Sequence, residues 1–558
     1  MKSNYIRIFL IALIVVIFMS LMARWEEMFS PKQTLTSQNQ SQTSSQQMST
    51  TASDTKQPVV TVDATKQDFN SDNIKPISLD TKVFANLEIS PLNGAIINAA
   101  LKDYDVSLTD KSPMPLLNNK TGSKYIAQSI IYINNQPQKI IFTQHSVDKK
   151  TTETIVTLSA QTQGIEVVRQ YIIDDTAYAI TVKQSIKNTT NVPVSITFDN
   201  EITREVIPES HSFSLFDAHS YSFQGVGLSS NQKPFQKESF SDLAKSTQAV
   251  GVTTNKGWAA MIQHYFVSLW LPNNPNTSFN VYANKLATNT YQSGVKTQPV
   301  VVESSQSIEN TNILYTGPTI TKNLEAMVKD FGANRPDGLD KLVDYGMLSF
   351  ISVIIFWLMT LIHNVVNNWG VAIILVTVLI KLLFYPLSAK SYKSMAKMRM
   401  LQPRMKKLQE LYKGDRQKLG RKMMEMYKEE KVNPASGCLP ILIQIPVFIA
   451  LYWVLLESVQ LRQAPFVFWL HDLASKDPYF ILPILMGISM FVQQKISPTS
   501  ADPMQARIMM LMPVIFTVFF ASFPSGLVLY WLTNNVISIA QQWYITRKYT
   551  AIYKAKRA

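Results

Sequence analysis

The stretch GVAIILVTVLIKLLFYPLSAK (residues 370–390) joins an apolar run to a basic segment and carries Lys381 among leucines and isoleucines. Its apolar part is long enough to be a membrane helix. The segment that follows, 390–431, contains fourteen Lys or Arg residues and five Asp or Glu residues. Because short basic loops stay on the cytoplasmic side of a membrane, the stretch predicts a helix that crosses from the outside to the cytoplasm.

Composition separates the chain into a membrane part and a water-soluble part. The 558 residues are 46% hydrophobic with a mean hydropathy of +0.01, and the apolar runs crowd residues 8–25 and everything beyond about 346. Residues 30–340 are polar in the manner of a globular domain. Much of the net charge of +14 lies in the segment 390–431, so it indicates a membrane-facing loop and no specific DNA binding. Cys438 is the only cysteine, which excludes internal disulfides and cysteine-based zinc sites.

The N-terminal segment predicts an anchor helix followed by a linker. FLIALIVVIFMSLMARW (9–25) follows two basic residues and lacks a small-x-small cleavage site, so we interpret residues 1–29 as an uncleaved anchor with its N-terminus in the cytoplasm. A cleaved signal peptide is the alternative. Residues 30–77 are rich in Ser, Thr and Gln without any apolar period, which predicts a flexible linker.

Residues 78–318 predict an all-β sandwich. Short runs rich in Val, Ile, Thr, Tyr and Phe, such as IEVVRQYII and YAITVKQSI, alternate with turn residues, and a helical period first returns in 319–332. We find no nucleophile, acid pair or metal cluster in this region, so we expect no enzyme activity, no cofactor and no metal site. A binding or spacing role is the default expectation.

The C-terminal region offers six apolar segments, at 346–366, 370–387, 437–456, 479–495, 508–523 and 525–545. The linker NNWG (367–370) is too short to reverse two full spans, and 346–366 carries polar residues along its length. We therefore interpret 319–368 as a connecting segment that ends in an amphipathic helix in the outer interface. The remaining five segments alternate in direction. Together with the anchor they give six spans, both termini in the cytoplasm and a basic cytoplasmic tail at 547–558.

The basic segment 390–431 predicts a hairpin of two amphipathic helices separated at Gly414-Asp415. Apolar residues recur at helical spacing, and the candidate interaction residues are Met395, Met398, Arg399, Met405 and Met423. One interpretation is a solvated, positively charged hairpin near anionic lipid headgroups. The other is that the flexible Met face contacts varied apolar segments, or that the charge contacts ribosomal RNA.

Lys381 needs an explanation because a charge at the bilayer centre costs roughly 2.5–3.5 kcal/mol on insertion scales. Snorkelling to the inner interface and a buried ion pair are two explanations, although Glu457 is the only acidic residue in the spans or at their ends. The third, which we favour, is a water-filled cavity open to the cytoplasm. Its candidate polar lining is Thr377, Gln444, Asn534, Asn535 and Ser538.

Four stretches carry a resemblance to a known family: YPLSAKSYKSMAKMRMLQPRMKKLQE (385–410), NPASGCLPILIQIPVFIALYWVL (433–455), LRQAPFVFWLHDLASKDPYFILPILMG (461–487) and DPMQARIMMLMPVIFTVFFASFPSGLVLYWLTNN (502–535). They resemble the YidC branch of the YidC/Oxa/Alb membrane protein insertases over nearly all of 340–546. The resemblance implies a bacterial inner-membrane protein with a five-helix insertase core (369–546), an N-terminal anchor helix and a large periplasmic all-β sandwich. It also implies nascent membrane proteins as substrates, with the Sec translocon and its accessory subunits, the ribosome and membrane lipids as partners.

The resemblance further implies a hydrophilic groove in which the family usually has an arginine at the position of Lys381. Lysine keeps the positive charge and loses the two-pronged hydrogen bonding of a guanidinium, which favours simple charge attraction. We add Tyr530 and Trp531 to the predicted groove, and Phe448, Met486 and Phe519 to a predicted substrate slide along the flanking helices. The alternative function is a secondary transporter of a small anionic solute, although no second copy of the 370–456 pattern is present.

Overall fold

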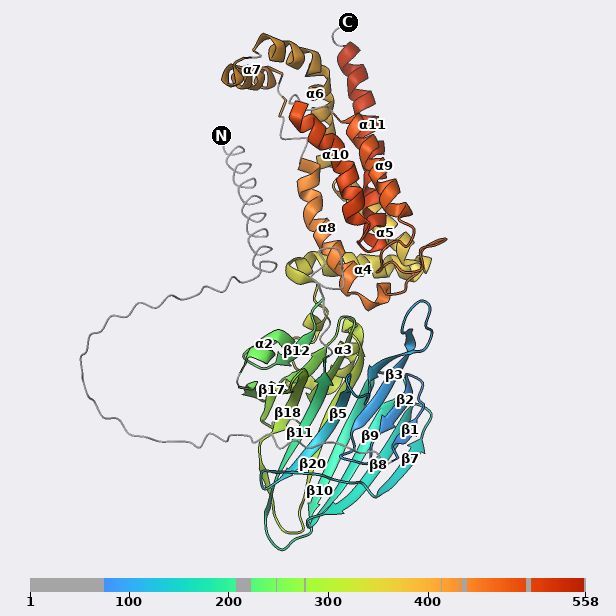
Figure 1. The fold of residues 1–558 in the computed structure, drawn as a ribbon, viewed down its shortest axis with the longest axis vertical. Coiled ribbons are helices and arrows are strands. Elements are labelled where there is room, and N and C mark those ends of the chain that lie inside the picture. The colour runs from blue at the N-terminus through green and yellow to red at the C-terminus, as the bar shows by residue number, and fades with distance from the viewer. Residues whose placement is uncertain are drawn as a thin grey trace, which may run out of the picture. The chain divides into compact units, whose positions relative to one another are not determined.

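The computed structural model describes residues 75–206, 222–246, 248–274, 277–412, 414–430, 432–433, 439–497 and 503–555 (Figure 1). The predicted anchor at 1–29 and nearly all of the predicted linker at 30–77 lie outside the described residues. The strands of the β domain come first in the chain and the long helices follow.

The β domain consists of two large antiparallel sheets. The first sheet follows the order β1 (Ile77–Leu79), β2 (Phe84–Ile89), β3 (Ile96–Asp105), β5 (Tyr125–Ile133), β11 (Val194–Glu205), β18 (Thr290–Thr297), β17 (Phe279–Ala287), β14 (Val250–Thr254), with β4 (Pro113–Leu117), β6 (Gln136–Gln138) and β19 (Val300–Val302) pairing beside it. The second follows the order β13 (Gln236–Ser239), β12 (Gly225–Ser229), β15 (Trp258–Ile262), β16 (Phe266–Pro272), β20 (Ser307–Pro318), β10 (Ala179–Asn188), β9 (Ile165–Asp174), β8 (Glu153–Thr162), β7 (Gln144–Lys149). The all-β sandwich predicted from the sequence is confirmed.

Alternation of buried and more exposed side chains explains why these segments form strands. Along β8 and β9 every second residue is buried, as a sheet with one face toward the core requires. The two strands pair from Thr162 and Ile165 through the two-residue turn Gln163-Gly164, whose φ angles are 47° and 74°. Two positive φ angles in succession match the right-handed twist of the flanking strands, and the turn therefore fixes their register.

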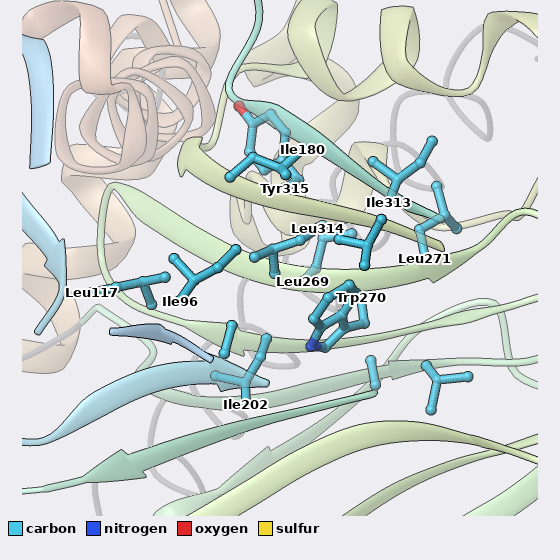
Figure 2. Close-up of a cluster of buried hydrophobic side chains, with 14 of the residues drawn as sticks. Ile96, Leu117, Ile180, Ile202, Leu269, Trp270, Leu271, Ile313, Leu314 and Tyr315 are labelled. Atoms are coloured by element: carbon cyan, nitrogen blue, oxygen red, sulfur yellow. The ribbon is translucent and has the colours of Figure 1, made fainter. Parts of the chain in front are cut away.

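Large apolar side chains from both sheets fill the space between them (Figure 2). Trp270 on β16 is buried, and its indole N–H donates to the backbone oxygen of Glu201 on β11 at 3.1 Å, which ties the second sheet to the first. Ile202 of β11 and Leu314 of β20 belong to the same cluster. A buried indole with a satisfied N–H contributes both apolar area and orientation to such a core.

Short helices accompany the sandwich: α2 (Phe240–Lys245), α3 (Thr321–Met327), η2 (Lys329–Asn334), η3 (Asp340–Leu342) and η4 (Gly346–Leu348). The sequence did not predict α2, which is only six residues long and is capped by the side chain of Ser239. The helix expected over 319–332 is shorter than predicted, and Leu324 of α3 is buried in the core of the β domain.

The long helices are α4 (Ser349–Val366), α5 (Trp369–Leu383), α6 (Tyr385–Leu411), α7 (Arg416–Glu429), α8 (Leu439–Glu457), α9 (Ile481–Ile496), α10 (Pro503–Phe520) and α11 (Ser525–Ala555), with the short η6 (Val459–Leu461) after α8. Several bounds differ from the predicted ones; α10, for example, begins five residues earlier and ends three residues earlier than the predicted 508–523. The helix expected over 370–387 ends at Leu383, and the last helix continues through most of the segment predicted to be a basic tail.

Helix α4 lies across the end of the bundle that α8, α9, α10 and α11 form (Figure 1). It buries Ser352, Ile355 and Met359 and exposes apolar side chains on its other face, among them Phe350 and Trp357. By length and composition, Gly346–Val366 is the one helix of the described residues that could cross a membrane alone. The bent pair α5 and α6 makes a second candidate, whereas the apolar parts of α8, α9 and α10 are shorter.

Candidate functional site: a buried lysine among polar helix contacts

The end of α5 places Lys381. Pro386 is at the start of α6, where it has no N–H to donate back to α5 and its ring crowds the carbonyl four residues earlier. The chain therefore turns by 69° between Leu383 and Tyr385. This bend leaves Lys381 in the last turn of α5, closer to the helix end than the sequence predicted.

The side chain of Lys381 is enclosed by protein, with only 3% of the residue exposed. Its Nζ donates a hydrogen bond of 2.7 Å to Oγ of Ser538 on α11, and Ser538 Oγ donates in turn to the backbone oxygen of Asn534 at 2.7 Å. Among the described residues no carboxylate lies within ion-pair distance of the ammonium. The charge is therefore buried with a neutral partner, which is an expensive arrangement.

A polar stripe on α11 connects Lys381 to the neighbouring helices. Nδ2 of Asn534 donates to Oε1 of Gln444 on α8 at 3.2 Å, and Nδ2 of Asn535 donates to Oγ of Ser489 on α9 at 3.0 Å. Thr377 is buried one turn before Lys381 and donates to the Ile373 carbonyl of its own helix. The structure thus brings Gln444, Asn534 and Ser538 into one network with Lys381, while Asn535 turns toward α9.

An aromatic layer lies next to this network along α11. Trp531 packs edge-on against Phe448 of α8, with ring centres 5.0 Å apart, and close to Phe520 of α10 at 5.4 Å. Tyr530 is buried beside the same Phe448. The indole N–H of Trp531 is buried and has no hydrogen-bond partner among the described residues. The predicted groove residues Tyr530 and Trp531 are therefore parts of an apolar wall that carries one unused donor.

The three residues predicted for a substrate slide have different surroundings. Phe519 on α10 is partly exposed, together with its neighbours Val514 and Val518. Phe448 is packed within the aromatic layer, and Met486 is fully buried in the helical core. The exposed apolar face of α10 is thus continuous, and the structure does not bring Met486 to it.

The basic segment forms the predicted hairpin of α6 and α7. The Met-rich faces of the two helices pack against each other. Leu401 and Met405 of α6 are buried against Met426 of α7, with Met398 and Met423 partly buried around them. Met395 is partly buried and Arg399 is exposed. The methionines mostly form the small core of the hairpin, because two amphipathic helices bury their apolar faces against each other first.

Sequence reasoning missed the continuation of the polar stripe toward the end of α11. Gln542 is buried and its Nε2 donates to Oγ of Ser497 at 3.2 Å, while the amide oxygens of Gln494, Gln541 and Gln542 are buried without partners among the described residues. The spacing of Asn535, Ser538 and Gln542 along one helix face was the available signal. Ser489 offered none, because a single serine in an apolar helix is common.

Comparisons with known proteins agree over the whole chain. The family model described as "YidC periplasmic domain" matches residues 76–358, and the one described as "60Kd inner membrane protein" matches residues 361–552. "Membrane protein insertase YidC" of Francisella philomiragia subsp. philomiragia is 54% identical over 561 residues, covering 99% of this chain and 100% of that protein. The protein of the same description from Francisella tularensis subsp. novicida is also 54% identical, over 566 residues with the same coverage.

Solved structures are more distant. A structure described as "Active YidC insertase crystal structure with the first transmembrane domain resolved" has a TM-score of 0.39 and 18% identity and covers 84% of this chain and 94% of its own. An α-galactosidase of Geobacillus stearothermophilus has a TM-score of 0.30 and 7% identity and covers 46% and 43%. At these TM-scores the likeness carries no argument about function. The two family models and the full-length relatives carry it instead, and by them the chain belongs to the YidC family of membrane protein insertases.

Proposed function

We propose that this insertase works through a polar groove centred on Lys381. Membership of the family makes the protein a non-enzymatic insertase of the inner membrane. The observation that carries the groove proposal is a buried ammonium that donates to a serine hydroxyl and has no carboxylate partner among the described residues. An anionic or strongly polar group that replaces the hydroxyl stabilises such a buried cation, because hydrogen bonds between charged partners are stronger than those to a neutral hydroxyl.

The proposed first step is entry of the hydrophilic end of a nascent chain from the cytoplasmic side. A carboxylate or backbone carbonyl of that end takes the place of Ser538 Oγ at Lys381. The amide side chains of Gln444 and Asn534 offer further donors and acceptors, and the unused indole donor of Trp531 adds one more. Each such contact offsets part of the free-energy cost of moving a polar segment from water into lipid.

The proposed second step is release of the apolar segment into lipid. Helices α8 and α10 flank the polar network, and α10 presents Val514, Val518 and Phe519 on an exposed apolar face. An apolar segment that moves along such a face exchanges one hydrocarbon contact for another, so the step needs no nucleotide and no covalent chemistry. The hydrophilic end then follows across the outer leaflet.

The proposed topology has six spans with both termini in the cytoplasm. Helices α5, α8, α9, α10 and α11 cross, and α4 lies in the outer interface; the anchor that would be the sixth span lies outside the described residues. The short connection Asn367-Asn368 supports this assignment, because a spanning helix at the position of α4 would need a longer connection to α5. The exposed basic hairpin is the proposed contact for the ribosome and for anionic lipid, and the Sec translocon is a proposed partner of the whole protein.

Substitution of Lys381 tests the groove. Lys381→Glu should lower insertion of a short substrate with an acidic translocated end about tenfold, because like-charge repulsion replaces attraction and about 1.4 kcal/mol corresponds to that factor. Lys381→Arg should keep most of the activity and Lys381→Ala should give an intermediate value. The measurement is protease protection of the translocated end in cells depleted of the native protein.

A matched control is Lys183→Ala, which removes an exposed lysine of β10 in the β domain and should leave insertion of this substrate unchanged. A substrate with a neutral translocated end provides the second control and should depend less on residue 381. Normal insertion of the acidic substrate by Lys381→Glu would contradict the proposed attraction.

A further inference from the structure

The loop between α8 and α9, residues 458–480, is ordered by two carboxylates. Asp472 accepts hydrogen bonds from the backbone N–H groups of Gln463 and Ala474 at 3.0 and 2.9 Å. Asp477 accepts from the indole of Trp469 at 3.0 Å and from the backbone N–H of Tyr479 at 3.0 Å. These bonds fix the path of the loop, so its surface is determined in advance of any contact.

This ordered loop nevertheless presents large aromatic side chains outward. Phe468 is 85% exposed, Tyr479 is 65% exposed and Phe480 is 45% exposed. Phe468 and Phe480 also have φ angles of 52° and 56°, in the left-handed region that bulky residues rarely adopt. Two phenylalanines held in a disfavoured conformation with their rings outside the protein indicate a contact beyond the chain.

The exposed aromatic side chains continue an apolar surface of α9. Phe480, Ile484, Ile488 and Phe491 are spaced by four, four and three residues, which places them on one face of the helix, and all four are exposed. Along a membrane-spanning helix such a face contacts lipid. The ring of Phe468 is stacked on that of Trp469, 6.2 Å away and inclined by 17°, and Trp469 shares the carboxylate of Asp477 with Tyr479. Through Trp469 and Tyr479, the carboxylate of Asp477 thus links Phe468 to the apolar face of α9 that begins at Phe480.

The charges of the loop fit a lipid headgroup region. The carboxylate of Asp477 is buried, and that of Asp472 is occupied by donors of the loop itself, whereas Lys476 is exposed. At headgroup depth the ammonium of Lys476 would face the anionic phosphates of the lipid. Tyrosine and tryptophan are the residue types enriched at this depth. The geometry favours lipid over a protein partner because the apolar surface runs on without a break into α9.

We propose that loop 458–480 is an outer-leaflet anchor, with Phe468, Tyr479 and Phe480 inserted at the headgroup and upper acyl level of the lipid. The inference rests on the proposed topology, which puts this loop on the periplasmic side. The anchor holds the outer end of α9 at a fixed depth in the bilayer. The depth of the short apolar helices of the bundle therefore stays constant while substrates move past them.

Spin-label accessibility in the full-length protein tests the anchor. Because Cys438 is the only cysteine, a Cys438→Ser background allows a single label at Phe468→Cys, with Tyr479→Cys as a second position should the first variant fold poorly. The proteins are reconstituted in vesicles of phosphatidylethanolamine and phosphatidylglycerol. The relaxation of the label by oxygen, which partitions into lipid, is compared with its relaxation by a water-soluble nickel chelate.

Two control positions calibrate the scale. Leu286→Cys on β17 replaces an exposed apolar residue of the β domain and should report water, and Ile488→Cys on α9 should report acyl chains. The label at Phe468 should show an oxygen-to-nickel ratio at least threefold above that at Leu286 and below that at Ile488. A ratio equal to that at Leu286 would overturn the proposal, and so would shielding from both reagents, which would indicate contact with a second copy of the chain.

The depth measurement is independent of the groove and of the side of the membrane. Insertion activity of the same labelled proteins reports on the groove, and labelling of Lys476→Cys by an impermeant maleimide in spheroplasts reports on the side. Failure of the proposed function with a high oxygen-to-nickel ratio would leave the anchor in place. Failure of the anchor with normal insertion would leave the groove in place.

Discussion

Ser538 decides whether the ammonium of Lys381 has a partner within the protein. It accepts from Nζ at 2.7 Å while donating to the backbone oxygen of Asn534, so this hydroxyl partners one of the three N–H groups of the ammonium and has its own donor satisfied. Interhelical hydrogen bonds in membranes average only about 0.6 kcal/mol. A buried charge raises that value, because losing its partner costs the desolvation of the charged group.

Ser538→Ala should therefore lower the free energy of unfolding by about 1–3 kcal/mol. Thr533→Ala is the matched control, because Thr533 lies on the same helix and bonds only the Leu529 carbonyl one turn before it among the described residues. Thermal unfolding of both variants in detergent measures the difference. Equal melting temperatures for the two variants would contradict the role of Ser538 as partner of the ammonium.

Glu201 gives the β domain a pH-dependent stability. Its carboxyl is buried on β11, where it accepts hydrogen bonds from Gln128 at 2.6 Å and from Gln292. Burial, with the nearby Asp199 carboxylate adding to it, raises the pKa of Glu201 from its ordinary 4.5 to about 8. In the unfolded chain the group loses its proton near its ordinary pKa.

The folded state therefore holds a proton that the unfolded state has released, and stability falls as the pH rises between the two pKa values. The contribution is complete below about pH 4.5 and is lost by about pH 8, with a slope of up to about 1.4 kcal/mol per pH unit. Glu201→Gln should flatten this fall and raise the melting temperature at pH 8. Circular dichroism of the strand signal in the full chain measures it, and an unchanged pH profile would refute the assignment.

At the scale of elements, the hairpin of α6 and α7 is a small folded unit with its own core. Leu401→Ser should loosen it, because a leucine that is 3% exposed contributes about 2–5 kcal/mol when truncated. Leu411→Ser changes the same residue type on the same helix at a position that is 75% exposed and should have no such effect. Limited trypsin digestion of the full-length protein in detergent compares the two, and equal cleavage rates within 390–431 would argue against a packed hairpin.

The sequence predicted the existence of the elements better than their ends. Alternation in β8 and β9 and apolar length in α8 and α9 were readable, because each reflects burial of one face or one whole segment. The end of α5 was predicted four residues late, since hydropathy continues through Leu387 and Pro386 acts on the backbone alone. The burial of the hairpin methionines was also hidden, because a sequence shows an apolar face and not what covers it.

At the scale of the whole molecule, the sequence resemblance identified the family, and the chemistry of single side chains was enough to predict many of the site residues. Lys381 stood out because a charge in an apolar run is costly, and Ser538 and Asn534 stood out because they share one face of a helix. Direct bonding between Lys381 and Ser538 could not be predicted, since it depends on the angle at which α5 and α11 cross. The network residues come from helices α5, α8 and α11 and are up to 157 positions apart in sequence, and only the packed bundle brings them together.

Helix α11 has a structural consequence through its length. In the proposed topology, in which α11 crosses the membrane, its 31 residues span about 46 Å at about 1.5 Å per residue, against about 30 Å of hydrocarbon, so about three turns extend beyond the lipid. On that protruding part the ring of Tyr549 lies under the ammonium of Lys393 on α6, at 4.7 Å. Eleven residues earlier the same helix holds Ser538. One continuous helix thus connects the start of the hairpin, through Tyr549, to the serine that accepts the hydrogen bond from Lys381.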